Sequence, residues 1–273
     1  IGCEWKYAGK DFPGFINGPL KCREDLDKLM IPDAPSGYFA HYLEVTQRVC
    51  DTLGDRYHLS VSILGPFAVG CFLRGIQEAM LDTLADPDFF RCYMEVCNEF
   101  SIYFGRQILK INNIKPILNE IFLKPEMVRP DTFHELIAPN DKRVQDVLGP
   151  SNAPNSLAAF MGRPGDSESQ KGGRDLYKAF FNGVDSVTQL ENVLSHSLPG
   201  LPFPAAISGL ALDSKSSEEL VDYLRSVLDF LVREQGRYPA ILLTSVQADS
   251  REKAKAIAQK IEMIKKLRDE YQL

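Results

Sequence analysis

The sequence lacks the features that mark several large classes of protein. It contains no run of about 18 apolar residues, which a membrane-spanning helix would need. The formal net charge is −6, whereas a nucleic-acid-binding domain usually carries a clustered basic excess. No secretory signal peptide is recognisable at the start. We therefore expect a cytoplasmic protein that spans no membrane and binds no nucleic acid.

Patterns typical of metal sites and disulfides are also missing. The six cysteines form no CxxC pair, and most lie in apolar, helix-like segments, where cysteine is usually a small core residue. The four histidines show no HxH, HxxxH or HxC spacing. We therefore expect reduced thiols and assign no metal ligands.

Common nucleotide and nucleophile motifs are absent as well. No GxGxxG follows a strand, and neither GxxxxGK[ST] nor GxSxG occurs. The Gly-rich stretch MGRPGDSESQKGG, residues 161–173, has the glycines of a phosphate loop but not its pattern. It is interpreted as a polar loop, with a mobile lid over a pocket as the functional alternative.

What the sequence does contain is an alternation of short apolar strands and amphipathic helices. Strands are predicted at residues 59–64, 114–122, 156–161, 184–190, 203–208 and 239–244. Helices are predicted at residues 38–53, one long helix after Pro66, then Pro87 to about 110, 130–147, 174–181, 216–235, and a final helix capped by Asp249 with Glu252. This order indicates a parallel sheet covered by helices. About six units fit a single-domain α/β chain, residues 1–273, folded as a (β/α)8 barrel without its first one or two units. A doubly wound open sheet is the alternative.

Candidate site residues follow from the rule that working groups sit at the carboxyl ends of such strands. Gly65, Pro66 and Phe67 end the first strand, where glycine lets a ligand approach and a helix N-terminus favours an anion. Glu120 lies near the end of the next strand among apolar neighbours, which would raise its pKa and suit it to acid–base work. The alternatives are a simple tight turn at Gly65-Pro66 and a surface ion pair for Glu120.

Three further residues complete the predicted pocket. Glu191 follows another strand, so the argument made for Glu120 applies to it. Arg129 has the planar fork that binds carboxylate or phosphate, although a solvated arginine is the more common situation. Gln247 comes three residues after Thr244, the predicted end of the last strand.

Several segments together resemble the uroporphyrinogen decarboxylase superfamily. They are residues 13–16 (PGFI), 24–33 (EDLDKLMIPD), 65–75 (GPFAVGCFLRG), 84–89 (LADPDF), 129–144 (RPDTFHELIAPNDKRV) and, more weakly, 203–228. The resemblance implies a (β/α)8 barrel with a deep pocket at its carboxyl face. One branch of the superfamily decarboxylates uroporphyrinogen without a cofactor. The other transfers methyl groups between a corrinoid protein and a thiol such as coenzyme M, with a zinc ion that activates the thiol; the spacing here looks more like this branch.

The sequence departs from both branches. The arginine-rich motif of the decarboxylases would precede Ile1, and since no initiator Met is present we expect the natural beginning to be missing. The methyltransferase zinc ligands would be a His-x-Cys in mid-chain and a later Cys. The corresponding places here read SLAAFMGRPGD (residues 156–166) and Thr244 to Gln247, without Cys or His. The zinc site is therefore not carried over.

The sequence thus predicts a barrel enzyme for methyl transfer linked to a corrinoid protein. Glu120 and Glu191 are the predicted catalytic residues, and Gly65, Pro66, Phe67, Arg129 and Gln247 the predicted substrate-binding residues. Decarboxylation of a uroporphyrinogen-type tetrapyrrole is the first alternative, and a non-catalytic ligand-binding relative the second. No oligomeric state is predicted.

Overall fold

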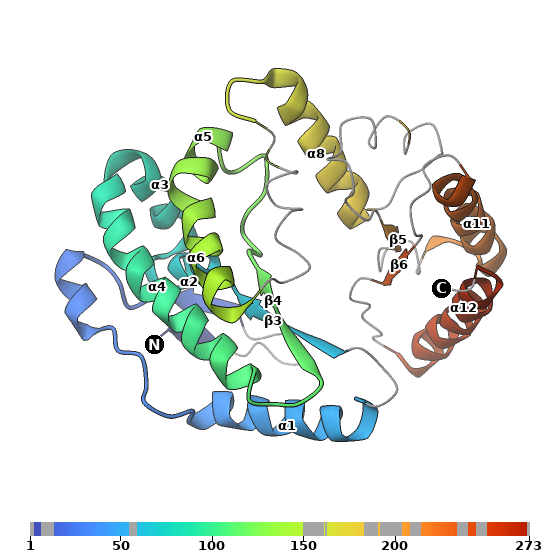
Figure 1. Cartoon of the computed structure of the whole chain (residues 1–273), viewed down its shortest axis with the longest axis horizontal. Helices are drawn as coiled ribbons and strands as arrows, with labels where there is room; N and C mark the ends of the chain where they lie inside the picture. The colour runs from blue at the N-terminus through green and yellow to red at the C-terminus, as the bar shows by residue number, and fades with distance from the viewer. Residues whose placement is uncertain are drawn as a thin grey trace. The chain divides into compact units, whose positions relative to one another are not determined.

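The computed structural model describes most of the chain, in two compact units (Figure 1). The described residues are 3–6, 14–54, 59–149, 161, 163–182, 191, 204–207, 214–233, 240–243 and 250–271. The first unit comprises Ile1–Ala158 and the second Ala159–Leu273. Each unit is described by itself.

The first unit holds most of the described elements. They are β1 (Glu4–Lys6), β2 (Gly14–Asn17), the 3-10 helix η1 (Arg23–Lys28), α1 (Gly37–Leu53), β3 (Leu59–Leu64), α2 (Pro66–Arg74), α3 (Ile76–Ala85), α4 (Pro87–Ile108), β4 (Ile114–Asn119), α5 (Pro130–Thr132), the π-helical turn η2 (Phe133–Ile137) and α6 (Ala138–Leu148). Strands β1 and β2 pair in antiparallel fashion.

Strands β3 and β4 form a parallel pair, as the alternation predicts. Leu59 lies opposite Ile114 and Leu64 opposite Asn119, so the two strands end level with each other. A parallel pair needs a long crossover connection, which α2, α3 and α4 provide. Strand β4 ends at Asn119, whereas the sequence predicted its end at Phe122. Glu120 is therefore the first residue beyond the strand.

The core of this unit is built around α4. Figure 1 shows α2, α4 and α6 together on one side of β3 and β4. Apolar residues from the strands, α4 and α6 form one buried cluster: Ile63, Ile102, Ile108, Leu118 and Val144. Phe67 of α2 and Phe90 of α4 are fully buried as well. Burial of this apolar surface is what holds the carboxyl ends of the two strands in place.

The region after Pro66 corrects one prediction, because it forms two helices instead of one. Gly75 has a φ angle of 101°, which ends α2 and starts α3. Residues other than glycine rarely adopt such a φ. The predicted cap of the next helix is confirmed: the Asp86 carboxylate accepts a hydrogen bond from the Phe89 N–H at 3.0 Å, and Pro87 takes the first helical position.

The helix predicted from residue 130 to 147 is present, but its hydrogen-bonding pattern changes on the way. The N–H of Ala138 bonds to the carbonyl of Phe133, five residues back, which makes a π-helical turn. Pro139 follows directly and has no N–H to give to the carbonyl four residues earlier. The wider turn accommodates this missing donor.

The second unit contains α8 (Ser167–Asn182), β5 (Pro204–Ile207), α11 (Ser217–Arg233), β6 (Ala240–Leu243) and α12 (Arg251–Glu270). Strands β5 and β6 are parallel, with Pro204 opposite Ala240. The capping box of α11 is confirmed, since the Ser216 N–H donates to the Glu219 carboxylate (2.7 Å) and the Glu219 N–H to the Ser216 hydroxyl (3.2 Å).

Two predictions for this unit are wrong at helix starts. Residues 167–173 belong to α8 and not to a loop, because Asp166 accepts the N–H of Ser169 (3.1 Å) and starts the helix early. The cap of α12 is Ser250, whose hydroxyl accepts the Lys253 N–H (3.1 Å), and not Asp249. Of the strand predicted at 156–161, only Met161 is described, and it is helical. The strand predicted at 184–190 lies outside the described residues.

The described residues thus show an α/β fold with two parallel strand pairs. Within them, no helix is long and apolar enough to cross a membrane. All six cysteines are free thiols, with Cys50, Cys71 and Cys97 buried.

Candidate functional site

The carboxyl ends of β3 and β4 meet at one edge and carry four of the predicted site residues. The Gly65 N–H donates to the Asn119 carbonyl at 3.0 Å, which continues the strand pairing into the turn. Pro66 then starts α2. The structure therefore brings Gly65, Pro66, Phe67 and Glu120 together, as the sequence predicts.

The Glu120 side chain caps the N-terminus of α2. Its Oε1 accepts the N–H of Phe67 at 2.9 Å, and its Oε2 accepts the N–H of Ala68 at 2.6 Å. Pro66 has no N–H to satisfy. The next donor, Val69, bonds to the Gly65 carbonyl at 2.9 Å. The first turn of α2 is therefore fully satisfied, and its positive end faces a carboxylate.

Gly65 is required by the position of this carboxylate. A Cβ at residue 65 would lie 2.2 Å from Glu120 Oε1 and 2.4 Å from Glu120 Cδ. The Glu120 side chain therefore occupies the space that any other residue would need at this turn.

A second buried carboxyl group, Asp141 of α6, lies within hydrogen-bonding reach of Glu120. Glu120 is 4% exposed and Asp141 6% exposed. Burial, and the negative charge of Asp141, raise the pKa of Glu120 well above its usual range, while the two backbone N–H groups act in the opposite direction. Burial raises the pKa of Asp141 to about 7. Near neutral pH the pair therefore holds a proton that two exposed carboxyl groups would have lost.

Two thiols lie close enough to this carboxyl pair for the charge of Glu120 to affect their pKa. Burial and the charge of Glu120 raise the pKa of Cys71 on α2 and of Cys97 on α4. Both thiols therefore stay protonated, which makes them packing residues and poor nucleophiles. Next to them, the Ser101 hydroxyl donates to the Leu64 carbonyl at 2.9 Å and ties α4 to the end of β3.

The solvent-facing part of this edge is formed by other side chains. Asn119 and Ile121, which flank Glu120, are exposed. Phe122 is half-buried and packs edge-on against Phe72 of α2, with ring centroids 5.0 Å apart. A ligand at this edge would meet an amide, an aliphatic and two aromatic groups, while Glu120 is turned toward the backbone.

The remaining predicted residues are not brought to this turn by any described contact. Arg129 is exposed and lies 3.6 Å from Asp131 in an ion pair. Glu191 is exposed and belongs to the second unit. Gln247 lies outside the described residues. The roles of these three residues stay predictions.

The sequence analysis did not identify Asp141, although its position in the apolar stripe of a helix could have indicated it. It stands four residues after Ile137 and three before Val144, both buried, so it occupies a core position of an amphipathic helix. An acid in an apolar stripe requires a partner, and this pattern indicates a buried carboxyl group.

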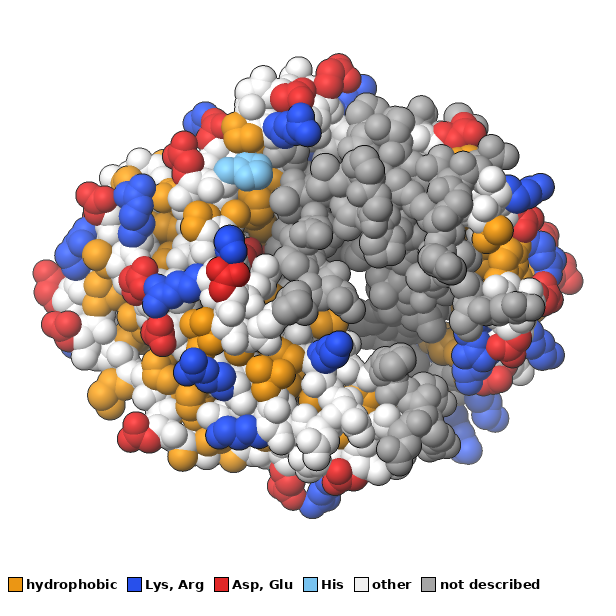
Figure 2. All heavy atoms as spheres, in the orientation of Figure 1, with side chains coloured by type: hydrophobic (Ala, Val, Ile, Leu, Met, Phe, Trp, Pro, Cys, Tyr) orange, Lys and Arg blue, Asp and Glu red, His pale blue; other side chains and the backbone are white. Residues whose placement is uncertain are grey.

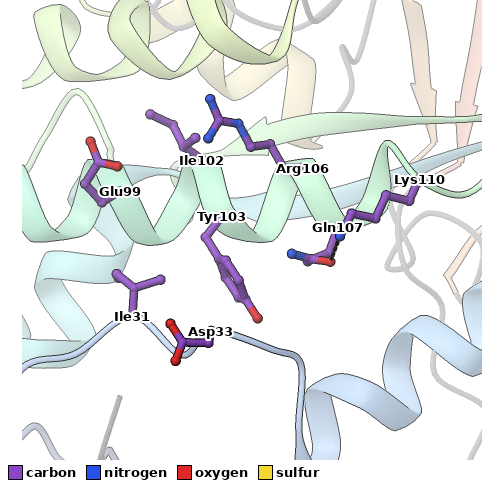
Figure 3. Close-up of a pocket in the computed structure, with 8 residues that line it drawn as sticks. All are labelled: Ile31, Asp33, Glu99, Ile102, Tyr103, Arg106, Gln107 and Lys110. Carbon is purple, nitrogen blue, oxygen red and sulfur yellow. Dashed lines mark hydrogen bonds between the residues drawn. The ribbon is translucent and has the colours of Figure 1, made fainter.

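A separate pocket of about 450 Å³ lies in the first unit (Figure 3). Ile31 and Asp33 line it on one side. The other side is formed by Lys110, just beyond α4, and by five residues of α4: Glu99, Ile102, Tyr103, Arg106 and Gln107. Its Gln107 and Lys110 lie at the end of α4 that leads into the amino end of β4. Because active sites of parallel α/β folds form at the opposite edge, we do not place the candidate site there.

The surface over α4 and α6 carries charges of both signs (Figure 2). Arg143 of α6 pairs with Glu99 of α4 at 2.9 Å and also with Glu95, and Lys142 pairs with Asp146 at 2.8 Å. These pairs are exposed and contribute little to stability. They turn the cations of α6 away from the buried Asp141.

The residues present do not fit the zinc site implied by the resemblance. The two places where its ligands would stand contain no thiol and no imidazole. Among the described residues, no three His, Cys, Asp or Glu side chains gather as metal ligands would. We therefore derive no step through zinc.

Comparisons with known proteins add independent findings. The profile of the family described as uroporphyrinogen decarboxylase (URO-D) matches residues 1–163 of the 273. A comparison with curated protein sequences found no match. Among solved structures, a methyltransferase from Methanosarcina mazei matches with a TM-score of 0.68 and 15% identity, over 96% of this chain and 76% of that chain. At that identity the similarity concerns the fold alone.

Proposed function

The chain belongs to the uroporphyrinogen decarboxylase family, and on this premise we propose that it is a methyltransferase that moves a methyl group from a corrinoid protein to a thiol. The proposal is supported by the agreement between the family profile and the structural match. A family profile covers the first 163 residues, and the fold of a methyltransferase covers 96% of the chain. The spacing of residues 24–33 and 65–89, which resembles the methyltransferase branch, points in the same direction.

We further propose that the complete fold is a (β/α)8 barrel whose carboxyl face holds the active site. Each of the two parallel strand pairs is a fragment that such a barrel contains. In this proposal the Gly65 turn and the end of β4 form one wall of the pocket, and Glu120 positions that wall. Arg129, Glu191 and Gln247 remain candidates for contact with the substrate.

The chemistry of methyl transfer suits the groups at this edge. The thiolate sulfur forms a bond to the methyl carbon while the carbon–cobalt bond breaks and leaves its electron pair on cobalt. Such a displacement needs alignment of donor and acceptor and exclusion of water more than it needs a proton donor. Ile121 and the Phe72–Phe122 pair supply apolar surface for that purpose.

Decarboxylation of a tetrapyrrole is the second candidate, because the matching family profile carries that description. It would need cations for the substrate carboxylates and an acid for the new carbon. Arg129 is the predicted cation and is exposed. A non-catalytic ligand-binding relative is the third candidate.

The test uses the full chain with free methylcobalamin as methyl donor and 2-mercaptoethanesulfonate as acceptor. We expect loss of the methylcobalamin absorbance together with the appearance of the methylated thiol. Gly65→Val, which forces the turn open, should abolish turnover, whereas Asp146→Asn on the surface should leave it unchanged. Equal rates with and without protein would refute methyl transfer by this chain.

A further inference from the structure

Ser101 carries a buried hydroxyl on the apolar face of α4, and the proposed function gives it no role. It is 1% exposed and lies one turn after the buried Cys97. A serine or threonine within a helix commonly donates to the carbonyl four residues earlier, as Thr46 does to Tyr42 at 2.8 Å. Ser101 instead donates to the carbonyl of Leu64, 37 residues away, at 2.9 Å. Its hydroxyl therefore connects α4 to the end of β3.

That carbonyl belongs to the peptide group between Leu64 and Gly65, which we call the entry peptide because it leads into the turn. A trans peptide group is planar, and its C=O and N–H point in opposite directions. The N–H of the entry peptide donates to the Asn119 carbonyl of β4 at 3.0 Å. Its C=O accepts the hydrogen bond from Ser101 of α4. A strand and a helix thus hold this peptide plane from opposite sides.

The glycine at position 65 gives this double attachment its importance. Glycine is needed there because the Glu120 side chain fills the space that a Cβ would occupy. Glycine also adopts positive φ angles about as readily as negative ones, so the peptide group before it can flip at little steric cost. In the structure Gly65 has a φ of −72°. A flip would break the hydrogen bonds at both ends of the entry peptide and turn the chain in another direction.

We propose that Ser101 is a positioning residue, whose hydroxyl holds the entry peptide and thereby sets where the start of α2 meets Glu120. The N–H groups that Glu120 accepts, those of Phe67 and Ala68, come shortly after the entry peptide. Their alignment with the side chain of Glu120 therefore depends on the direction in which the chain leaves β3. The proposal rests on the proposed function only in treating this turn as part of the active site.

The helix that carries Ser101 is itself held in place at this level. Asn98, on the same buried face of α4, donates to the Asn140 side chain of α6 at 2.7 Å, and Asn140 donates to the Leu136 carbonyl at 2.7 Å. Ile63 and Ile102, the sequence neighbours of the two bonded residues, belong to one buried apolar cluster. The hydroxyl and the carbonyl are thus presented by segments that are already packed, so their hydrogen bond costs little further ordering.

Hydrogen exchange of the full chain, read out by mass spectrometry of its peptides, tests the proposal without turnover. Ser101→Ala removes the hydroxyl, and Ser101→Cys keeps a side chain of similar shape that donates only weakly. Thr46→Val in α1 is the control, because it removes a buried hydroxyl that bonds within its own helix. In both Ser101 variants, peptides covering residues 64–70 should exchange roughly tenfold faster than in the wild type, and those of α1 at the wild-type rate. Thr46→Val should leave the exchange of residues 64–70 unchanged.

Three results would overturn the proposal. The turn in Ser101→Ala could exchange at the wild-type rate, or Ser101→Cys could match the wild type, in which case packing and not the hydrogen bond holds the turn. Equal acceleration in the turn and in α1 would report unfolding of the whole unit and not release of the entry peptide. None of these results depends on catalysis, so each would leave the methyl-transfer proposal intact.

A kinetic readout separates positioning from stability. In the assay with methylcobalamin and 2-mercaptoethanesulfonate, Ser101→Ala should lower kcat roughly tenfold and leave KM for the thiol nearly unchanged, because a displaced wall disturbs alignment in the transition state. A wild-type kcat in a variant whose turn exchanges faster would overturn the positioning role. Absence of turnover by the wild-type chain would refute methyl transfer, and the exchange rates would then decide the role of Ser101 by themselves.

Discussion

At the scale of residues, one contact accounts for the composition of the turn after β3. The carboxylate of Glu120 reaches two N–H groups that are 53 and 52 positions away in sequence. Proline at position 66 removes a donor that the carboxylate could not also satisfy, and glycine at 65 leaves the space that the carboxylate fills. These residues work as one unit, so a change in any of them should disturb the others.

Gly65→Ala should therefore destabilise the protein. The new Cβ would clash with Glu120, and overpacking of this kind typically costs about 1–3 kcal/mol. Gly70→Ala is the matched comparison within α2. Its Cβ would make a tight contact with Tyr93, at 3.3 Å, but no overlap like that at Gly65, and alanine favours helix by about 1 kcal/mol, so it should destabilise the protein less. Urea unfolding of both variants checks this, and equal midpoints would contradict the described packing at Gly65.

At the scale of elements, helix positions are predictable from sequence, but their interruptions are not. The span of α1 and the cap of α4 follow from local patterns that the fold keeps. The break at Gly75 and the π-helical turn before Pro139 arise where one residue changes the backbone hydrogen bonding within a continuous apolar pattern. The periodicity of apolar residues in the sequence does not reveal such changes in backbone hydrogen bonding.

Asp86→Ala should destabilise the start of α4. The variant loses the bond to the Phe89 N–H, and loss of an N-cap costs about 1 kcal/mol. Its ion pair with Arg23, at 3.2 Å, is half-exposed and should add little. Asp88→Ala, in the first turn of the same helix, is the control and should shift the thermal midpoint less. A larger shift for Asp88→Ala would contradict the assignment of the cap.

At the scale of the whole molecule, the sequence indicates which residues gather at the strand ends but not how they are used. Glu120 was found because strand ends carry function, yet its carboxylate faces the backbone. Its partner Asp141 comes from a helix that the strand rule does not consider. Tertiary contacts of this kind are not encoded in the spacing of one element. The closed barrel likewise rests on the family and on the fold match, since the described strands form pairs.

The most direct test of the proposed function compares both family chemistries on one preparation of the full chain. The protein is incubated with methylcobalamin and 2-mercaptoethanesulfonate, and separately with uroporphyrinogen, and the products are quantified by mass spectrometry. The account predicts the methylated thiol in the first reaction and unchanged uroporphyrinogen in the second. Loss of carboxyl groups from uroporphyrinogen, without methylation of the thiol, would contradict it.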